Sequence, residues 1–176
     1  MNMTALLEQM RPARRFTDRP IAEPLLLELL NDAVWAPTHK LREAWRFIRI
    51  TDSARPRLRT TVDSSRYPAL ATVLKEAPLL LIVAVPDSPN SHVAEDDFAA
   101  ACCLIQNLQL LAWEQGIGMA WELADYSRCA SLLATAQVRE DERIAGVLGL
   151  GYFANDDRNA DLPPRPDSTD LQVQVW

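Results

Sequence analysis

Apolar positions along the chain recur with the periods of helices and, elsewhere, of strands. In residues 23–35 leucines recur on one face, Pro24 stands in the first turn and Pro37 prevents continuation, which predicts an amphipathic helix. Residues 93–115 are apolar nearly all round from Phe98 to Trp113 and stop at Gly116, which predicts a long helix in the core. Weaker patterns predict further helices at 4–10, 53–62, 71–77 and 127–136.

Four shorter segments have the patterns of strands. Residues 79–85 form a continuous apolar run between two prolines, which predicts a central strand covered on both faces. Further strands are predicted at 45–51, 119–123 and 143–153. The order of elements predicts an α+β or α/β fold with a small mixed sheet flanked by helices.

The tail from residue 154 is rich in Asp, Asn and Pro and ends in LQVQVW, which alternates like a strand. A strand at the extreme end of a chain, after a long polar crossing, often pairs with an edge elsewhere. We therefore predict a single domain over residues 1–176, whose tail, 154–176, is a candidate to cross to a second subunit.

Composition places the chain among globular proteins. It has 176 residues, 48% of them hydrophobic and 24% charged. The first residues lack the long apolar region of a signal peptide, and the longest apolar run is strand-sized, so no membrane span is expected. Cys102, Cys103 and Cys129 form no metal or disulfide pattern, which favours reduced thiols and a cytoplasmic location. Cys102 and Cys103 are interpreted as buried within the long helix.

Charge is unevenly distributed. The net charge is −6, yet residues 1–60 hold 11 basic against 7 acidic side chains. An acidic protein is a poor nucleic-acid binder, so no nucleic-acid partner is expected. The basic first third indicates either a local anion site, such as one for a phosphate, or an ordinary solvated face.

Common catalytic signatures are absent from the sequence. It contains no phosphate-binding P-loop, no dinucleotide-binding glycine fingerprint, no GxSxG and no HExxH, and it has only two histidines. If the protein is an enzyme, a cofactor is expected to supply the difficult chemistry.

Several segments, in order, resemble one family. RPARRFTDRPI, a leucine-rich helix and WAPTHKLREAWRFI are similar to the N-terminal signature of the nitroreductase family of FMN-dependent oxidoreductases. The APTHK at residues 36–40 resembles its small single-domain subgroup, and GIGMAW and VLGLGYF match later family strands. The resemblance implies a three-layer α+β fold and an interlocked homodimer.

The resemblance also implies a reaction. Hydride would pass from NADH or NADPH through FMN to a small electron-poor acceptor, such as a nitroaromatic or a quinone. The flavin N5 atom would carry the hydride, so no side chain is assigned as catalytic.

The phosphate-binding segment departs from the family pattern. The family's Arg-Arg-Ser falls on Met10, Arg11 and Pro12, so an arginine and a serine that normally hold the flavin phosphate are both missing. Arg11 and Arg14 are predicted to compensate as phosphate ligands. Arg165, in the tail, is either a distal phosphate contact or part of a plain linker.

The loop after the leucine-rich helix is the second predicted part of the site. By resemblance, Thr38, His39 and Lys40 of one subunit reach the flavin held mainly by the other. His39 would contact the phosphate, the ribityl chain or the ring, whereas Lys40 either supplies charge or is solvated. Trp35 and Trp121 would wall the site, the alternative being that both belong to the core.

Two further residues follow Trp121, where the family often has small residues near the flavin ring. Glu122 would disfavour an anionic reduced flavin, or else point to solvent or pair with an arginine. Leu123, together with Met10 and Pro12, motivates two other interpretations. The chain would bind flavin without turnover, or would have lost flavin and act as a structural dimer.

Overall fold

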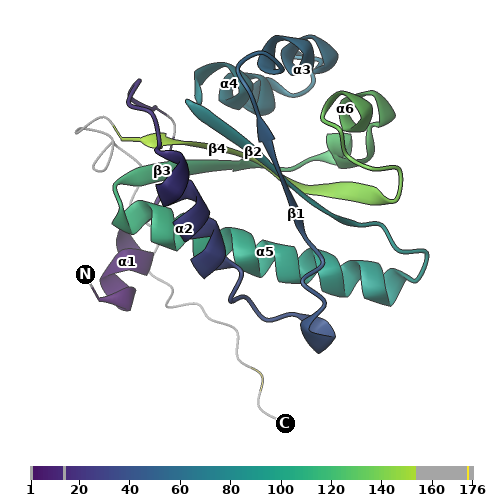
Figure 1. Cartoon of the computed structure of the whole chain (residues 1–176), viewed down its shortest axis with the longest axis horizontal. Coiled ribbons are helices and arrows are strands. Elements are labelled where there is room, and N and C mark those ends of the chain that lie inside the picture. The colour runs from purple at the N-terminus through teal and green to yellow at the C-terminus, as the bar shows by residue number, and fades with distance from the viewer. Residues whose placement is uncertain (1, 14, 154–173, 175–176) are drawn as a thin grey trace.

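The computed structural model describes residues 2–13, 15–153 and 174 of the chain. In chain order, the elements are α1 (Met3–Gln9), α2 (Glu23–Ala33), the 3-10 turn η1 (His39–Leu41), β1 (Arg46–Ile50), α3 (Arg55–Thr61), α4 (Pro68–Glu76), β2 (Leu79–Pro86), α5 (Ser91–Glu114), β3 (Ile117–Glu122), the 3-10 turn η2 (Asp125–Arg128), α6 (Ala130–Thr135) and β4 (Glu142–Tyr152) (Figure 1). The predicted α+β class is confirmed, and each predicted helix and strand in this part of the chain is present.

The four strands form one sheet in the order β1-β2-β4-β3. All three pairings are antiparallel, so the predicted mixed sheet is corrected to an antiparallel one as far as the structure describes strands. The prediction failed because strand direction depends on distant pairing, which the local pattern does not carry. The predicted strand at 171–175 lies in the part of the tail outside the described residues, apart from Gln174, so its exchange between subunits stays a prediction.

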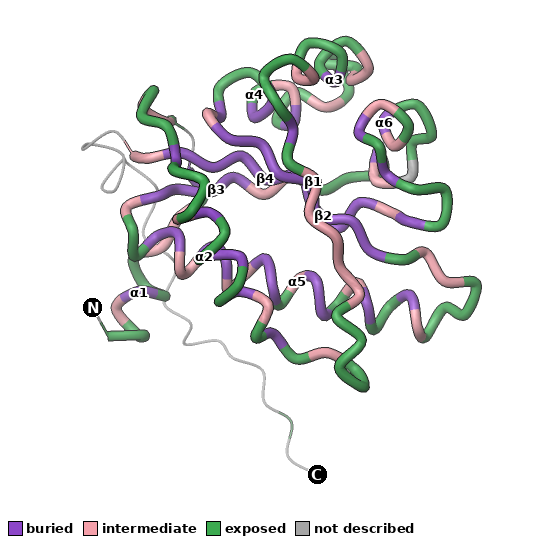
Figure 2. The backbone as a smooth tube through the Cα atoms, viewed as in Figure 1, coloured by how far each residue is buried: buried purple, intermediate pink, exposed green. Residues whose placement is uncertain are grey.

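Helices cover the sheet on both sides, which gives three layers. α2 and α5 pack on one face, and α3, α4 and α6 lie on the other (Figure 1). The central strands β2 and β4 are almost wholly buried (Figure 2), as the continuous apolar run at 79–85 predicted. In β1 the alternation sends Phe47 to the α5 layer and Ile48 to the α4 layer.

The long helix α5 is the main support of the sheet. Its first turn is capped by the Asn90 side chain, which accepts from the His92 N–H at 3.1 Å. The helix ends just before Gly116, whose φ of 75° is the left-handed conformation expected of a glycine after a helix. The prediction of buried thiols was wrong, because Cys103 is exposed and Cys102 half-buried on the side of α5 away from the sheet-facing leucines. No described helix is long and apolar enough to cross a membrane.

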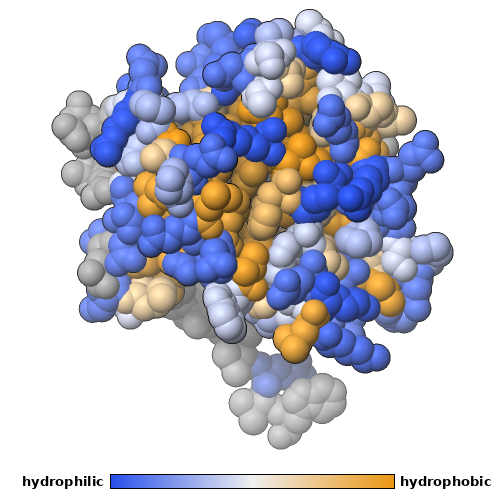
Figure 3. Space-filling view, in the orientation of Figure 1, coloured by the Kyte–Doolittle hydropathy of each residue, from blue (hydrophilic) through white to orange (hydrophobic). Residues whose placement is uncertain are grey.

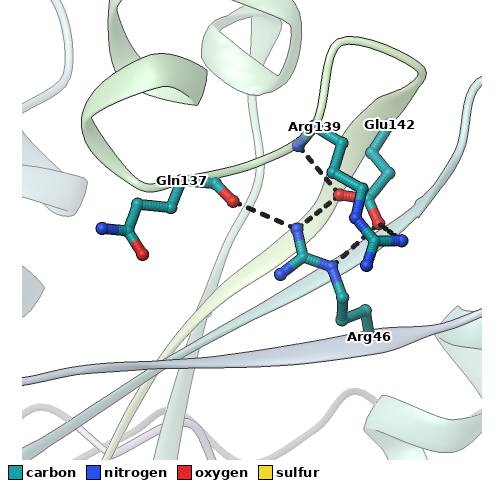
Figure 4. A network of polar contacts seen from close by, with 4 residues as sticks. All are labelled: Arg46, Gln137, Arg139 and Glu142. Carbon is teal, nitrogen blue, oxygen red and sulfur yellow. Dashed lines mark hydrogen bonds and ion pairs between the residues drawn. The ribbon is translucent and has the colours of Figure 1, made fainter.

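One buried carboxylate ties β1 to β4 at the end of the sheet. Arg46 donates from Nε to Glu142 Oε1 at 2.9 Å and from Nη2 to Glu142 Oε2 at 2.5 Å (Figure 4). Arg46 also donates to the Gln137 carbonyl at 3.1 Å, and the Arg139 N–H donates to Glu142 Oε2 at 2.9 Å. Bidentate arginine–carboxylate pairing of this kind is strong and directional.

Removing Arg46 is expected to destabilise the protein in a pH-dependent way. The hydrogen bonds from Arg46 hold the pKa of Glu142 below its usual range, although burial opposes them. A lowered pKa in the folded state means that the stabilisation is complete above the usual glutamate pKa and is lost as the pH falls through the lowered value. Arg46→Met should therefore cost about 2 kcal/mol at pH 7 and much less near pH 3, measured by urea unfolding.

Arg49→Met is the matched control for this prediction, because Arg49 lies on the same strand but is exposed. Its ion pair with Glu23 spans 3.5 Å between two exposed side chains. Such surface pairs contribute roughly 0.5 kcal/mol or less. Equal costs for the two variants, or a cost for Arg46→Met that does not change with pH, would contradict the assignment.

Candidate functional site

A cleft of about 440 Å³ opens where three distant segments meet. One wall is formed by the chain that follows α1, at Pro12, Ala13 and Phe16. The others are the outer face of α4 and the end of β3 at residues 120–122. The volume is within the range of pockets that bind organic cofactors.

The segment after α1 is held against the sheet by its backbone. The Ala13 N–H donates to the Met119 carbonyl at 3.1 Å, and the Thr17 N–H donates to the Tyr152 carbonyl at 2.8 Å. A Cβ atom on Gly118 would overlap Ala13, so the absence of a side chain there lets the segment lie close to β3. These contacts fix the position of Pro12 and Phe16 at the cleft.

Helix α4 forms the opposite wall. Leu70 and Leu74 are buried against the sheet, which leaves Ala69, Thr72 and Glu76 on the outer face, three and four residues apart. These three residues and Val73 border the cleft. The helix therefore offers the cleft a hydroxyl and a carboxylate beside small apolar groups.

The end of β3 provides the floor. Ala120 packs with the α4 layer, whereas the Trp121 ring packs against the α5 layer and donates from Nε1 to the Ala145 carbonyl at 3.2 Å. The strand alternation then returns Glu122 to the α4 side. Glu122 is half-buried, and burial raises the pKa of its carboxyl group.

Replacing Glu122 by glutamine is expected to stabilise the ligand-free protein at neutral and higher pH. Because the pKa of Glu122 is raised on folding, stability is greatest below the ordinary glutamate pKa and declines as the pH rises through the folded value. Glu122→Gln removes this cost, and thermal unfolding at pH 8 should occur roughly 1–2 °C higher, with little gain at pH 4. The exposed Glu140→Gln, which removes the same charge, should show no such difference; a gain at pH 4 as large as at pH 8 would contradict the prediction.

The structure brings together part of the predicted site. Pro12, Trp121 and Glu122 all border the cleft. Leu123, which directly follows the end of β3, is exposed. Arg11, which was predicted to hold a phosphate, does not border the cleft. Its Nη1 donates to the carbonyls of Glu8 and Met10, at 2.7 and 2.8 Å.

Arg11 therefore caps the C-terminal end of α1, where orphan carbonyls attract cations. Met10 is half-buried at that same end, next to the cleft segment. The other predicted phosphate ligands, Arg14 and Arg165, lie outside the described residues.

The predicted second part of the site lies elsewhere. His39 and Lys40 belong to η1 and Thr38 directly precedes it; Figure 1 places this turn at the end of the molecule away from β3 and the N-terminal segment. Within one chain these residues do not border the cleft. His39 and Lys40 are exposed, and Trp35 is 85% exposed, so the interpretation of Trp35 as a core residue is wrong.

The loop around η1 is nevertheless well anchored. Arg42 donates from Nη2 to Asp97 Oδ1 at 2.6 Å, and Asp97 is buried on α5. Lys40, Leu41 and Glu43 all have positive φ values, between 46° and 55°, which non-glycine residues rarely adopt. A strained, anchored loop is typical of segments that serve function rather than stability.

Sequence reasoning missed Phe16 and the whole contribution of α4. Ala69, Thr72 and Glu76 are ordinary surface residues of a short helix, and no local pattern marks them. Only the packing of α4 beside β3 places them at the cleft. No group of metal-ligating side chains occurs among the described residues.

Comparison with known proteins decides the family. The model of the Nitroreductase family matches residues 7–152. The chain belongs to the nitroreductase family. The predicted resemblance is therefore confirmed over most of the chain, including the segment after α1, α4 and β3, which form the cleft.

Three relatives illustrate the match. The putative NAD(P)H nitroreductase YfhC of Bacillus subtilis is 30% identical over 159 residues, covering 84% of this chain and 82% of its own. The crystal structure of a nitroreductase-like family protein from Bacillus cereus superposes with a TM-score of 0.83 at 27% identity, covering 100% and 97% of the two chains. A putative nitroreductase from Desulfovibrio desulfuricans, solved in complex with FMN, gives a TM-score of 0.80 at 20% identity, covering 100% and 99%.

Proposed function

We propose that the protein is an FMN-dependent oxidoreductase that transfers hydride from NAD(P)H to small electron-poor acceptors, such as nitroaromatics or quinones. The cleft between the segment after α1, α4 and β3 carries the proposal, because its volume of about 440 Å³ and its largely apolar lining suit an organic cofactor ring. The membership of the chain in the nitroreductase family, and the FMN bound to the Desulfovibrio relative, support the same cofactor.

The residues of the cleft suit a flavin. Phe16, Val73 and Ala120 offer apolar contact to a ring system, and Thr72 offers a hydroxyl at its edge. When bound, FMN would supply a centre that accepts and releases hydride. The protein's part is then to orient the ring, exclude water from one face and set the surrounding charge, to which Glu122 contributes.

A second subunit is part of the proposal. The loop holding Thr38 and His39 does not border the cleft of its own chain. It carries Leu41, which is 86% exposed, and Trp35, which precedes the loop, is also exposed. The edge strand β1 is lined by apolar side chains on the face seen in Figure 3. We propose that a homodimer covers these apolar surfaces and that the loop of one subunit completes the flavin site of the other.

Two alternatives rest on a specific observation. Arg11 caps α1, and the residues flanking it, Met10 and Pro12, supply neither a cation nor a hydroxyl for a phosphate. Weak binding of the flavin phosphate favours a protein that binds flavin without turnover, or one that has lost flavin and serves as a structural dimer.

The visible absorption spectrum of the purified protein separates these functions. We expect a flavin spectrum after addition of FMN, bleaching on addition of NADH or NADPH, and recovery with an acceptor such as a quinone. Flavin that binds but is not bleached would identify a binder without turnover. A colourless protein that ignores FMN would overturn the proposed function, and a narrow acceptor profile would contradict an open, unselective pocket.

A further inference from the structure

A second cleft, of about 530 Å³, lies between α3 and α4. The two helices are neighbours on the outer side of the sheet (Figure 1). Its lining mixes the hydroxyl-bearing residues Thr60, Ser64 and Thr72 with apolar residues, which are Pro56, Val62 and Ala71. Apart from the residues that line both clefts, its lining residues take no part in the proposed flavin site.

Two cations face this cleft in an otherwise acidic protein. Arg59 comes from α3 and Lys75 from α4, and Glu76 is the only carboxylate among the lining residues. Lys75 Nζ lies 2.7 Å from Glu76 Oε1, and the charges of Lys75 and Arg59 both lower the pKa of Glu76. The lining therefore keeps one positive charge in excess at neutral pH. The Thr60 and Thr72 hydroxyls donate to the carbonyls of Arg57 and Pro68, so they offer a ligand only their oxygen lone pairs.

The two clefts are adjacent. Thr72 and Glu76 line both of them, and they stand four residues apart on one face of α4. One turn of α4 is thus the partition between the cationic cleft and the proposed flavin cleft. A ligand that reaches across this turn can occupy both.

We propose that the cationic cleft binds the phosphate-bearing adenosine half of the reductant and selects NADPH through its 2′-phosphate. This inference rests on the proposed function, because the nicotinamide of the same molecule would lie in the flavin cleft. The planar guanidinium of Arg59 suits a bidentate phosphate contact, and Lys75 supplies a second charge. Val62 and Ala71, two apolar lining residues, offer contact to the base or ribose of this half.

Direct binding tests the site without any redox chemistry. Isothermal titration of the full-length protein with 2′,5′-ADP, which holds the phosphates but no nicotinamide, should show binding. Arg59→Ala and Lys75→Ala should each weaken it about tenfold, whereas Glu76→Gln, which removes the competing carboxylate, should tighten it. Arg57→Ala is the matched control, since Arg57 is an exposed residue of α3 that does not line the cleft.

Kinetics then separate this inference from the proposed function. With FMN bound, the wild type should have a lower KM for NADPH than for NADH, and Arg59→Ala should raise the NADPH value about tenfold and narrow that preference. Reduction by 1-benzyl-1,4-dihydronicotinamide, which has no phosphate, should be unchanged in the variant.

Three results would overturn the inference: a preference for NADH, equal KM values for NADPH in the two proteins, or an equal loss with the phosphate-free reductant. The last would place the effect of Arg59 in the flavin cleft. A protein that binds no FMN or is not reduced by any of these donors would instead contradict the proposed function, while titration with 2′,5′-ADP would still judge the cationic cleft.

Discussion

Replacing Gly149 by valine should destabilise the protein by about 3 kcal/mol and weaken flavin binding in the same variant. A Cβ atom at this position of β4 would lie 2.7 Å from Val73 Cγ1 and 2.7 Å from Ala77 Cβ. Both neighbours belong to α4 or its end, so the helix must move away from the sheet. Because valine is itself favoured in strands, a loss of stability reports the steric conflict rather than strand propensity.

Flavin binding should be affected because residues of α4 line the proposed flavin cleft. Val73 lies between the buried face of the helix and the cleft, and Thr72 and Glu76 line the cleft directly. A shift of the helix large enough to admit a side chain at Gly149 therefore changes the shape of the proposed flavin cleft. Urea unfolding and titration of the protein with FMN, followed by flavin fluorescence, measure the two effects.

A double-mutant cycle tests the mechanism of this destabilisation. Gly149→Ala alone should cost about 1–2 kcal/mol, and Val73→Ala on that background should recover part of the loss because it removes one of the two conflicting atoms. Additive costs of the two single substitutions would show that the helix does not press on Gly149, and the explanation would then be wrong.

Strong local patterns predicted elements but not how they assemble. The apolar run at 79–85 and the long apolar segment at 93–115 became β2 and α5 with boundaries shifted by one or two residues. The order of the strands and their antiparallel pairing could not be read from the sequence, because they depend on β1–β2 and β2–β4 pairings between residues up to 71 positions apart, such as Leu79 and Leu150.

The site divides in the same way. Pro12, Trp121 and Glu122 were singled out because the family resemblance aligns short motifs with the expected cofactor position; all three border the cleft, and their role in binding stays a prediction. Thr72 and Glu76 could not be singled out, since a threonine and a glutamate on a helix surface are unremarkable until the helix is placed beside β3. The strained loop with Thr38 and His39 was found from its motif, yet the structure of one chain leaves it away from the cleft, so its role stays a prediction.

The segment between α1 and the cleft lacks two groups that the family pattern has, an arginine at Met10 and a serine at Pro12, and restoring them should tighten FMN binding. Met10→Arg would add a guanidinium beside the cleft segment, and Pro12→Ser would add a hydroxyl and a backbone N–H at a residue that lines the cleft. Arg11 does not replace the missing phosphate ligands, because its Nη1 donates to carbonyls at the end of α1.

Two charge-assisted hydrogen bonds to a phosphate contribute on the order of 3 kcal/mol, so the Kd for FMN in the Met10→Arg, Pro12→Ser variant should fall about 100-fold. Riboflavin, which has the same ring but no phosphate, is the control ligand, and its affinity should not change. An FMN affinity equal to that of the wild type would show that these departures never limited flavin binding. An equal gain in affinity for FMN and riboflavin would show that the substitutions act on binding of the ring and not of the phosphate. In that case the missing arginine and serine would no longer be a reason to regard this family member as degenerate at its phosphate site.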